Sequence, residues 1–357
     1  MGSLLGFEKR PRASISRRRF LKNSATLAAA AAALARPKFV RAAGALKPVS
    51  LTLDWLFQGP NAGFLVAHAQ GFYRDAGLDV TISPGKGSGT TAQLVASKAA
   101  QIGFSDGFVV GTSIAKGMAI KTVASIYRRD PAAIMVLADS DIKSPKDLEG
   151  KSLGMTVGSA QFMQWPVFAK GAGLDVAKVP VVNIDPAGVS PALISGKVPA
   201  ICGYVFSYAP TIQVRAKKQL RMFWFADYGV TVVSNGIIVH QDLLKSDPDL
   251  IRAFVPAAIK GFLYGRQHPD AAYAAVKKFQ PTADPAITQL ELEQSWKTWV
   301  TPNTKGKPLG WGAEADWAST VDILKRNAGV TAPLVPSQIY TNEFVPTGTE
   351  YVPPQTA

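Results

Sequence analysis

Aromatic and amide side chains follow the first predicted strand of the chain, and these residue types are suited to binding small organic molecules. Trp55 ends the predicted strand at residues 51–55, and a tryptophan at a cleft can stack on a flat ring or cover an alkyl chain. Gln58 and Asn61 follow in the same loop. A tryptophan here would also suit a hydrophobic core, so both interpretations stay open.

A glycine-rich loop with hydroxyl side chains precedes the second predicted helix. Ser88, Gly89 and Thr90 stand at its start, where backbone N–H groups can bind a carboxylate, sulfonate or phosphate-like group. A serine or threonine at this position can also serve only as the N-cap of the helix. The loop differs from a nucleotide-binding phosphate loop, because no Gly-Lys-Ser/Thr sequence ends it.

A later part of the chain, residues 158–208, contains a similar set of polar and aromatic residues. Gly158, Ser159 and Gln161 begin a further predicted helix. Tyr204 and Tyr208 flank the end of a predicted strand in an apolar setting, where they could complete an aromatic clamp or close a second core.

Three aspartates also fall at the ends of predicted strands. Asp106, Asp185 and Asp227 could each accept a hydrogen bond from a cationic or amide-bearing ligand, although Asp185-Pro186 equally fits a turn. We predict the following ligand contacts: Trp55, Gln58, Asn61, Ser88, Gly89, Thr90, Asp106, Gly158, Ser159, Gln161, Asp185, Tyr204, Tyr208 and Asp227.

The sequence lacks the nucleotide-binding and zinc-binding motifs of common enzyme active sites. No Walker loop or His-Glu-x-x-His occurs. The three histidines are scattered, and Cys202 is the single cysteine, so neither a transition-metal site nor an intramolecular disulfide is expected. We therefore predict a protein that is not an enzyme and has no catalytic residue, cofactor or metal.

The elements that position these residues follow an α/β order. Residues 51–104 read strand–helix–strand–helix–strand with short connections, which predicts a parallel sheet covered by helices. Loops that follow parallel strands lie at the carboxyl edge of the sheet, where such folds bind ligands. A second pattern of the same kind begins at Ser152.

The order of strands and helices predicts two lobes. We assign residues 46–138 and 236–345 to lobe 1, which includes the C-terminal helices, and residues 139–235 to lobe 2. Because the chain crosses twice between the lobes, the crossings would form a two-stranded hinge that lets the lobes close over a ligand.

Residues 1–42 have the composition of an export signal. Of the chain's 39 Lys and Arg residues, ten lie here beside a single acid, Glu8, so the remainder carries a net charge of only +5. The run Ser16–Lys22 (SRRRFLK) resembles the twin-arginine export motif, and an alanine-rich segment of about eleven residues follows, too short to span a bilayer. Without the leader no basic cluster with interleaved aromatics remains, so a nucleic-acid partner is not expected.

Several short stretches between residues 50 and 240 resemble periplasmic substrate-binding proteins of ABC importers. The resemblance is to the nitrate, sulfonate and taurine type, which merges with binders of thiamine pyrimidine precursors. The stretches are Leu53–Trp55, Gly71–Tyr73 with Gly77–Val80, Gly85–Gly89, Gln101–Phe104, Ile142–Leu153, Leu193–Val198 and Asp227–Val230.

This resemblance implies a type II periplasmic binding protein fold, with two Rossmann-like lobes joined by a two-stranded hinge. It implies the solute-binding component of an importer, acting as a monomer in the periplasm and serving an ABC permease in the inner membrane. The solute would be a small aromatic or heteroaromatic molecule or a short organic anion, such as a sulfonate or a pyrimidine.

The chain departs from the pattern of the aminopyrimidine binders. Pro60-Asn61 is displaced relative to Trp55, and the next histidine, His68, falls within a predicted helix. Where those relatives carry a glutamate after the strand Ala200–Tyr204, this chain has residues 205–208 (VFSY). Two alternatives are an enzyme on the same scaffold, such as a pyrimidine-precursor synthase, and a binding protein that serves a sensor.

Overall fold

The computed structural model describes residues 45–354. Residues from Leu46 onward form one compact unit, and the predicted export signal at residues 1–42 lies outside the described residues. Within the described part of the chain, no helix combines the length and the apolar character needed to cross a membrane.

The first sheet has five strands in the order β2-β1-β3-β10-β4. Its edge strand β2 alternates buried and exposed residues, whereas β3, which has neighbours on both sides, is buried throughout. β1 pairs in parallel with β2 and β3, and β10 runs antiparallel between β3 and β4. The strands are β1 (Lys47–Thr52), β2 (Leu78–Ser83), β3 (Ile102–Asp106), β4 (Ile120–Ser125) and β10 (Asn235–His240).

The second sheet repeats this arrangement in the order β7-β6-β8-β5-β9. Here β5 is the antiparallel strand, paired with β8 and β9. Each sheet thus contains one strand that opposes the other four, whereas the sequence order predicted a parallel sheet. The strands are β5 (Ala132–Leu137), β6 (Leu153–Met155), β7 (Val181–Asn183), β8 (Ala200–Tyr204) and β9 (Leu220–Trp224).

The chain crosses between the sheets at residues 126–131 and again at residues 225–234. The strand at 132–137 therefore belongs to the second sheet, whereas the sequence analysis assigned residues up to 138 to lobe 1. The reason is that this apolar run becomes a central strand of the second sheet immediately after the crossing. The return to the first sheet at Asn235 lies one residue from the predicted boundary.

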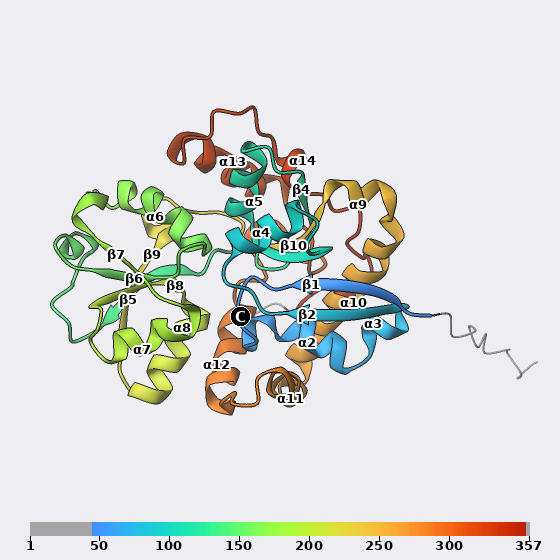
Figure 1. The fold of residues 1–357 in the computed structure, drawn as a ribbon, viewed down its shortest axis with the longest axis horizontal. Helices are drawn as coiled ribbons and strands as arrows, with labels where there is room; N and C mark the ends of the chain where they lie inside the picture. The colour runs from blue at the N-terminus through green and yellow to red at the C-terminus, as the bar shows by residue number, and fades with distance from the viewer. Residues whose placement is uncertain (1–44, 355–357) are drawn as a thin grey trace, which may run out of the picture. The chain divides into compact units, whose positions relative to one another are not determined.

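Helices cover both sheets, and most of the C-terminal helices pack on the first lobe (Figure 1). α10 lies against α2 so closely that a Cβ on Gly261 would meet the Gly63 carbonyl oxygen at 2.2 Å. α12 contacts both the loop after β1 and α8 of the second lobe. The helices of the second lobe are α6 (Ala160–Gly171), α7 (Val189–Ile194) and α8 (Val205–Thr211). Those of the first are α2 (Ala62–Ala69), α3 (Phe72–Asp75), α4 (Ser88–Ala96), α5 (Gly107–Ala115), α9 (Gln241–Ser246), α10 (Pro248–Gln267), α11 (Pro269–Phe279), α12 (Pro285–Trp296), α13 (Glu314–Asn327) and α14 (Pro336–Ile339).

Candidate functional site

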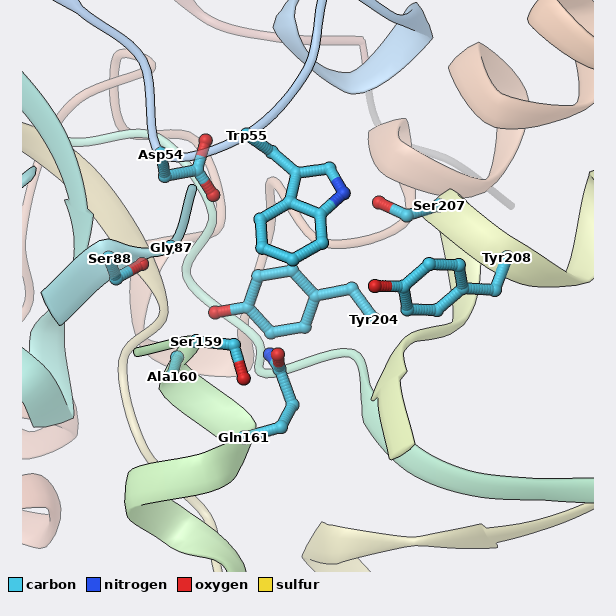
Figure 2. A pocket seen from close by; sticks show the side chains of 10 residues that line it. All are labelled: Asp54, Trp55, Gly87, Ser88, Ser159, Ala160, Gln161, Tyr204, Ser207 and Tyr208. Carbon is cyan, nitrogen blue, oxygen red and sulfur yellow. The ribbon is translucent and has the colours of Figure 1, made fainter. Parts of the chain in front are cut away.

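A small cavity lies between the two lobes, at the carboxyl ends of β1 and β8 and at the starts of α4 and α6 (Figure 2). Its volume is about 10 Å³, room for about one water molecule. A heteroaromatic ring would not fit, so a solute of that size needs the lobes to separate. The cavity is lined by Asp54, Trp55, Gly87, Ser88, Ser159, Ala160, Gln161, Tyr204, Ser207 and Tyr208.

Trp55 and Tyr208 face each other across the lobes. Their ring centroids are 6.3 Å apart at an interplanar angle of 84°, an edge-to-face arrangement. Trp55 follows β1 of the first lobe, yet it packs against a hydrophobic cluster of the second. Tyr208 lies over Gly203, where any Cβ would overlap its ring at 2.0 Å. The small residue in β8 therefore creates the space for the tyrosine.

Glycines allow the two lobes to approach each other at backbone level. The Gly89 N–H donates a hydrogen bond of 3.0 Å to the Gly158 carbonyl oxygen of the other lobe. Gly87 has φ of 131°, and a Cβ there would lie 2.4 Å from the same oxygen. Beside this contact the Gln58 side chain donates a 2.7 Å bond to Ser207 Oγ, also across the lobes.

The two helix starts that the sequence analysis singled out have different roles. Ser159 is the N-cap of α6, because its hydroxyl oxygen accepts a 3.1 Å hydrogen bond from Phe162 N. Ser88 does not cap α4 through its side chain. Its hydroxyl instead accepts a 3.2 Å bond from Asp106 N, which ties the start of α4 to the end of β3.

A buried polar cluster lies beside the cavity, with the hydroxyl of Tyr204 at its centre. This hydroxyl lies 2.9 Å from Asp106 Oδ2, 2.9 Å from Ser234 Oγ and 2.7 Å from Asn235 Oδ1. Asn235 Nδ2 in turn donates a 2.8 Å bond to Asp54 Oδ2. Among these residues Tyr204 comes from the second lobe. Gln164 of α6 also donates a 3.4 Å bond to Asp106 Oδ1, so two side chains of the second lobe hold the cluster.

Burial changes the titration of both carboxyl groups in this cluster. Desolvation raises the pKa of Asp54 to about 7, against the hydrogen bond from Asn235, which favours the charged form. Desolvation likewise raises the pKa of Asp106 to about 6, although Tyr204 and the N–H groups of Phe108 and Val109 bond to it. Asp106 is the N-cap of α5 through those two N–H groups.

Two buried polar atoms on the wall of the cavity lack a hydrogen-bond partner among the described residues. Asp54 Oδ1 offers an acceptor from the first lobe, and Gln161 Nε2 offers a donor from the second. Figure 2 shows the two side chains on opposite sides of the Tyr204 ring. Because an unpaired buried polar group costs about 1–3 kcal/mol, a ligand that bonds both atoms would recover that cost.

Comparison with known proteins assigns a family. The family model "NMT1/THI5 like" matches residues 59–272, more than half of the chain. The chain belongs to this family. The predicted resemblance is thereby confirmed.

Relatives of this NMT1/THI5-like chain include binding proteins and enzymes. The riboflavin-binding protein RibY of Chloroflexus aurantiacus is 27% identical, covering 85% of this chain and 87% of that one. The formylaminopyrimidine-binding protein of Halalkalibacterium halodurans is 23% identical, covering 84% and 91%. A protein of Legionella pneumophila named 4-amino-5-hydroxymethyl-2-methylpyrimidine phosphate synthase is 21% identical, covering 84% and 92%.

A solved structure supports the fold assignment of the NMT1/THI5-like chain. The periplasmic aliphatic sulphonate binding protein SsuA of Escherichia coli matches with a TM-score of 0.60 at 15% identity, over 82% of this chain and 91% of that one. The predicted periplasmic binding protein fold is thus confirmed, with mixed rather than purely parallel sheets.

Eight of the fourteen residues predicted as ligand contacts do not line the cavity of this NMT1/THI5-like chain. Gln58, Gly89 and Gly158 instead bond between the lobes, and Asp106 lies in the buried cluster. Asn61 is buried and directs its amide to the Leu56 carbonyl oxygen. Thr90 is exposed in the first turn of α4, and its hydroxyl would lie 3.2 Å from a Cβ on Gly158. Asp185 and Asp227 are exposed beyond the ends of β7 and β9, the two edge strands of the second sheet, and neither lines the small cavity.

Asp227 instead lies on a larger cavity of about 740 Å³, lined by both crossing segments and the ends of α12 and α13. None of the other predicted contacts lines it. The small cavity remains the candidate site, because six of the predicted contacts line it, whereas Asp227 alone of the predicted contacts lines the larger cavity.

Four residues that line the cavity were not among the predicted contacts: Asp54, Gly87, Ala160 and Ser207. Asp54 is the most informative, because a carboxyl group inside an apolar strand is a sequence signal for a buried functional group. Ser207 follows β8, where the aminopyrimidine pattern has glutamate, and Gly87 closes the glycine loop. Asn235 has no such signal, because only the sheet pairing brings it to Asp54.

The described residues contain no cluster of three or more His, Cys, Asp or Glu side chains that could hold a metal ion. The single cysteine, Cys202, is buried in β8, and burial raises the pKa of its thiol. A buried thiol of raised pKa is a poor nucleophile.

Proposed function

We propose that this chain is the solute-binding component of an ABC importer and captures a nitrogen heterocycle between its lobes. The observation that carries the proposal is the pair of unpartnered buried atoms, Asp54 Oδ1 and Gln161 Nε2, beside the facing rings of Trp55 and Tyr208. Once separation of the lobes has moved the two aromatic side chains apart, a flat ring would enter between them. Its N–H would bond the carboxyl group, and its carbonyl or ring nitrogen would bond the amide.

The charge of the site supports a neutral heterocycle over an anion. None of the ten lining residues is Lys or Arg, and the lining carboxyl of Asp54 would repel a sulfonate or nitrate at pH values above its pKa. Two relatives have names that denote the binding of nitrogen heterocycles, riboflavin and formylaminopyrimidine. These two names favour a heteroaromatic solute over a short organic anion.

Closure is proposed as a population shift. The ligand contacts both lobes only when they are together, so it stabilises the closed form by the difference between its affinities for the two forms. The crossings at residues 126–131 and 225–234 would supply the hinge. We further propose export by the twin-arginine route, a periplasmic location, a monomeric state and an ABC permease as the partner.

An enzyme of pyrimidine-precursor synthesis is the second candidate, because relatives bear that name at 20–24% identity. The binding proteins match at comparable or higher identity. A binding protein returns the solute unchanged, whereas an enzyme alters it, so mass spectrometry of the solute after incubation separates the two functions.

Titration calorimetry of the purified chain with riboflavin, formylaminopyrimidine and taurine tests the proposal. We expect one of the heterocycles to bind and taurine to give no heat. Binding of taurine alone would contradict the proposed substrate class. Mass spectrometry of any solute that copurifies provides a second, independent readout of that class.

The Gln161→Leu variant tests the site itself. It keeps the side-chain size and removes the donor, so we expect the affinity for the heterocycle to fall about tenfold, since a hydrogen bond is worth about 1 kcal/mol and its buried partner is then left unpaired. Gln93→Leu, on the exposed face of α4, is the matched control and should bind normally. Equal affinities of the two variants would remove Gln161 from the site.

A further inference from the structure

The oxygen atoms around Tyr204 outnumber the hydrogen atoms available to them. Four contacts of 3.1 Å or less join Tyr204 OH, Asp106 Oδ2, Ser234 Oγ and Asn235 Oδ1. With the carboxyl ionised, only the two hydroxyl groups supply a hydrogen. A hydrogen on Asp106 lets that group donate to Tyr204 while Tyr204 donates to Asn235. The cluster then has one more satisfied contact.

The orientation of the Asn235 amide does not remove this requirement. When Asn235 Nδ2 faces Asp54 Oδ2, it donates a hydrogen bond to Asp54, which can then be an ionised carboxylate. The additional hydrogen that the cluster needs is then on Asp106. In the reverse orientation Nδ2 donates to Tyr204 and Ser234, and Tyr204 can donate to an ionised Asp106. The amide oxygen then faces Asp54 Oδ2 at 2.8 Å, so Asp54 must carry the hydrogen. Either orientation needs one proton between the two carboxyl groups.

We propose that the closed chain holds one proton shared by Asp54 and Asp106, and that closure of the lobes takes this proton up from the solvent. Tyr204 is the part of the cluster that leaves with the second lobe when the lobes separate. Separation admits water to Asp106, which can then ionise and release the proton. Closure reverses the step, forming one O–H bond on a carboxylate. This proposal goes beyond the solute-binding function and does not depend on which solute binds.

No cation neutralises the carboxyl groups at this point of the fold. None of the ion pairs formed by the described residues includes Asp54, Asp106 or Asp130. Asp130 is a third carboxyl group near Asp106, and desolvation raises its pKa well above the usual range. The buried cation of the crossing segment, Arg128, interacts with Asp316 instead. The negative neighbours therefore all oppose ionisation of Asp106.

The remaining groups around Asp106 are neutral or titrate far from neutral pH. α4 contributes the Ser88 hydroxyl and α6 the Gln164 amide. Burial raises the pKa of Tyr204, Tyr127 and Cys202 well above their ordinary values. Apart from Asp130, the groups here whose pKa lies above its ordinary value near 3.8 and close to neutral pH are the two carboxyl groups of the cluster, at about 7 for Asp54 and about 6 for Asp106.

The direction of the pH dependence follows. Because the closed form has the higher carboxyl pKa, it is favoured at low pH and loses this advantage as pH rises from about 4 to about 7, after which the advantage is constant. One proton taken up changes the ratio of closed to open chain by up to about tenfold per pH unit in that window. A solute that drives closure would be bound more tightly at pH 5 than at pH 7 for the same reason.

Small-angle X-ray scattering of the purified, solute-free chain between pH 5 and pH 8 tests the proposal. We expect the radius of gyration of the wild type to increase as the pH rises. In Asp106→Asn the amide can donate to Tyr204 as the protonated acid does, and asparagine serves equally well as an N-cap. This variant should stay compact across the range. Asp185→Asn, which replaces an exposed carboxyl outside the hydrogen-bonded cluster, should expand like the wild type.

A residue-resolved measurement accompanies the scattering. Carbon-13 NMR of chain labelled at its aspartate carboxyl carbons should show carboxyl groups titrating near pH 6–7 in the wild type and one fewer in Asp106→Asn. A wild-type radius independent of pH, a parallel response of Asp106→Asn, or no carboxyl that titrates in this range would each overturn the proposal. None of these outcomes depends on whether riboflavin or any other heterocycle binds.

Discussion

Asp54 and Trp55 are adjacent residues at one turn of the chain, and the loop after β1 gives them different surroundings. Asp54 is 7% exposed and bonds to Asn235 of its own lobe, whereas Trp55 is half-buried against the second lobe. The tryptophan therefore depends on lobe contact, and the carboxyl group is held in place within the first lobe. A ligand that enters between the lobes would replace Tyr208 as the neighbour of Trp55.

Trp55→Ala is predicted to weaken solute binding by about 1–3 kcal/mol, because it removes a ring face and its buried apolar area. The fold should persist, since the side chain belongs to the loop and not to the core of either sheet. Titration calorimetry measures the effect, and thermal unfolding checks the fold. Trp224→Ala, at a tryptophan that is 37% exposed, is the control and should bind normally. An unchanged affinity of Trp55→Ala would exclude a stacking role.

At the scale of single residues, the sequence indicated much of the cavity wall. Trp55, Ser88, Gln161 and Tyr208 lie where strand-end and helix-start patterns predicted a site, although their contact with a solute remains a prediction. The hydrogen-bonded cluster could not be anticipated. Asn235 lies 181 positions from Asp54 in the chain, and no local pattern marks that pair.

At the scale of elements, strand order decides which strand ends face the other lobe. A strand end followed by an aspartate looks alike in the sequence whether the strand is central or at an edge. β7 and β9 are edge strands, so Asp185 and Asp227 lie at the periphery, whereas β8 is next to the crossing strand β5 and presents Tyr204 to the cleft. The sequence did not predict that β5 and β10 are antiparallel. Each of these strands enters its sheet directly from a crossing segment, and its direction depends on the lobe from which the chain arrives.

Gly87→Ala is predicted to hold the lobes apart. Its Cβ would lie 2.4 Å from the Gly158 carbonyl oxygen of the other lobe, and φ of 131° is unfavourable for any L-residue. Scattering should show a larger radius of gyration, and solute affinity should fall. Gly77→Ala is the matched control, because it also has positive φ, 82°, but nothing within 4 Å. If the two variants gave the same radius, the glycine contact would have no part in closure.

At the scale of the whole molecule, α12 connects the site to the rest of the protein. It contacts α8 of the second lobe, and its Glu291 accepts a 2.8 Å bond from Gly59 N in the loop after β1. A Cβ on Gly59 would lie 2.6 Å from the Cβ of Glu291, so glycine is needed for this approach. The loop that carries Trp55 is thus supported from behind by a buried carboxyl group without an ion-pair partner among the described residues.

This carboxyl group predicts a pH dependence of global stability. Desolvation raises the pKa of Glu291 from 4.5 to about 8, against the bond from Gly59. Its contribution to the free energy of unfolding is therefore fully present below pH 4.5 and falls as the pH rises to about 8. The slope is on the order of 1 kcal/mol per pH unit. Glu291→Gln stays neutral and keeps an acceptor for Gly59, so it should lack this slope.

Urea unfolding at several values between pH 5 and pH 8 measures the difference. We expect Glu291→Gln to match the wild type near pH 5 and to exceed it increasingly toward pH 8. The aspartates of the lobe contact titrate in both proteins, so their effect cancels in the comparison. Glu293→Gln, exposed on the same helix, should follow the wild type throughout. Parallel curves for Glu291→Gln and the wild type would mean that water reaches this carboxyl group and that α12 supports the loop by packing alone.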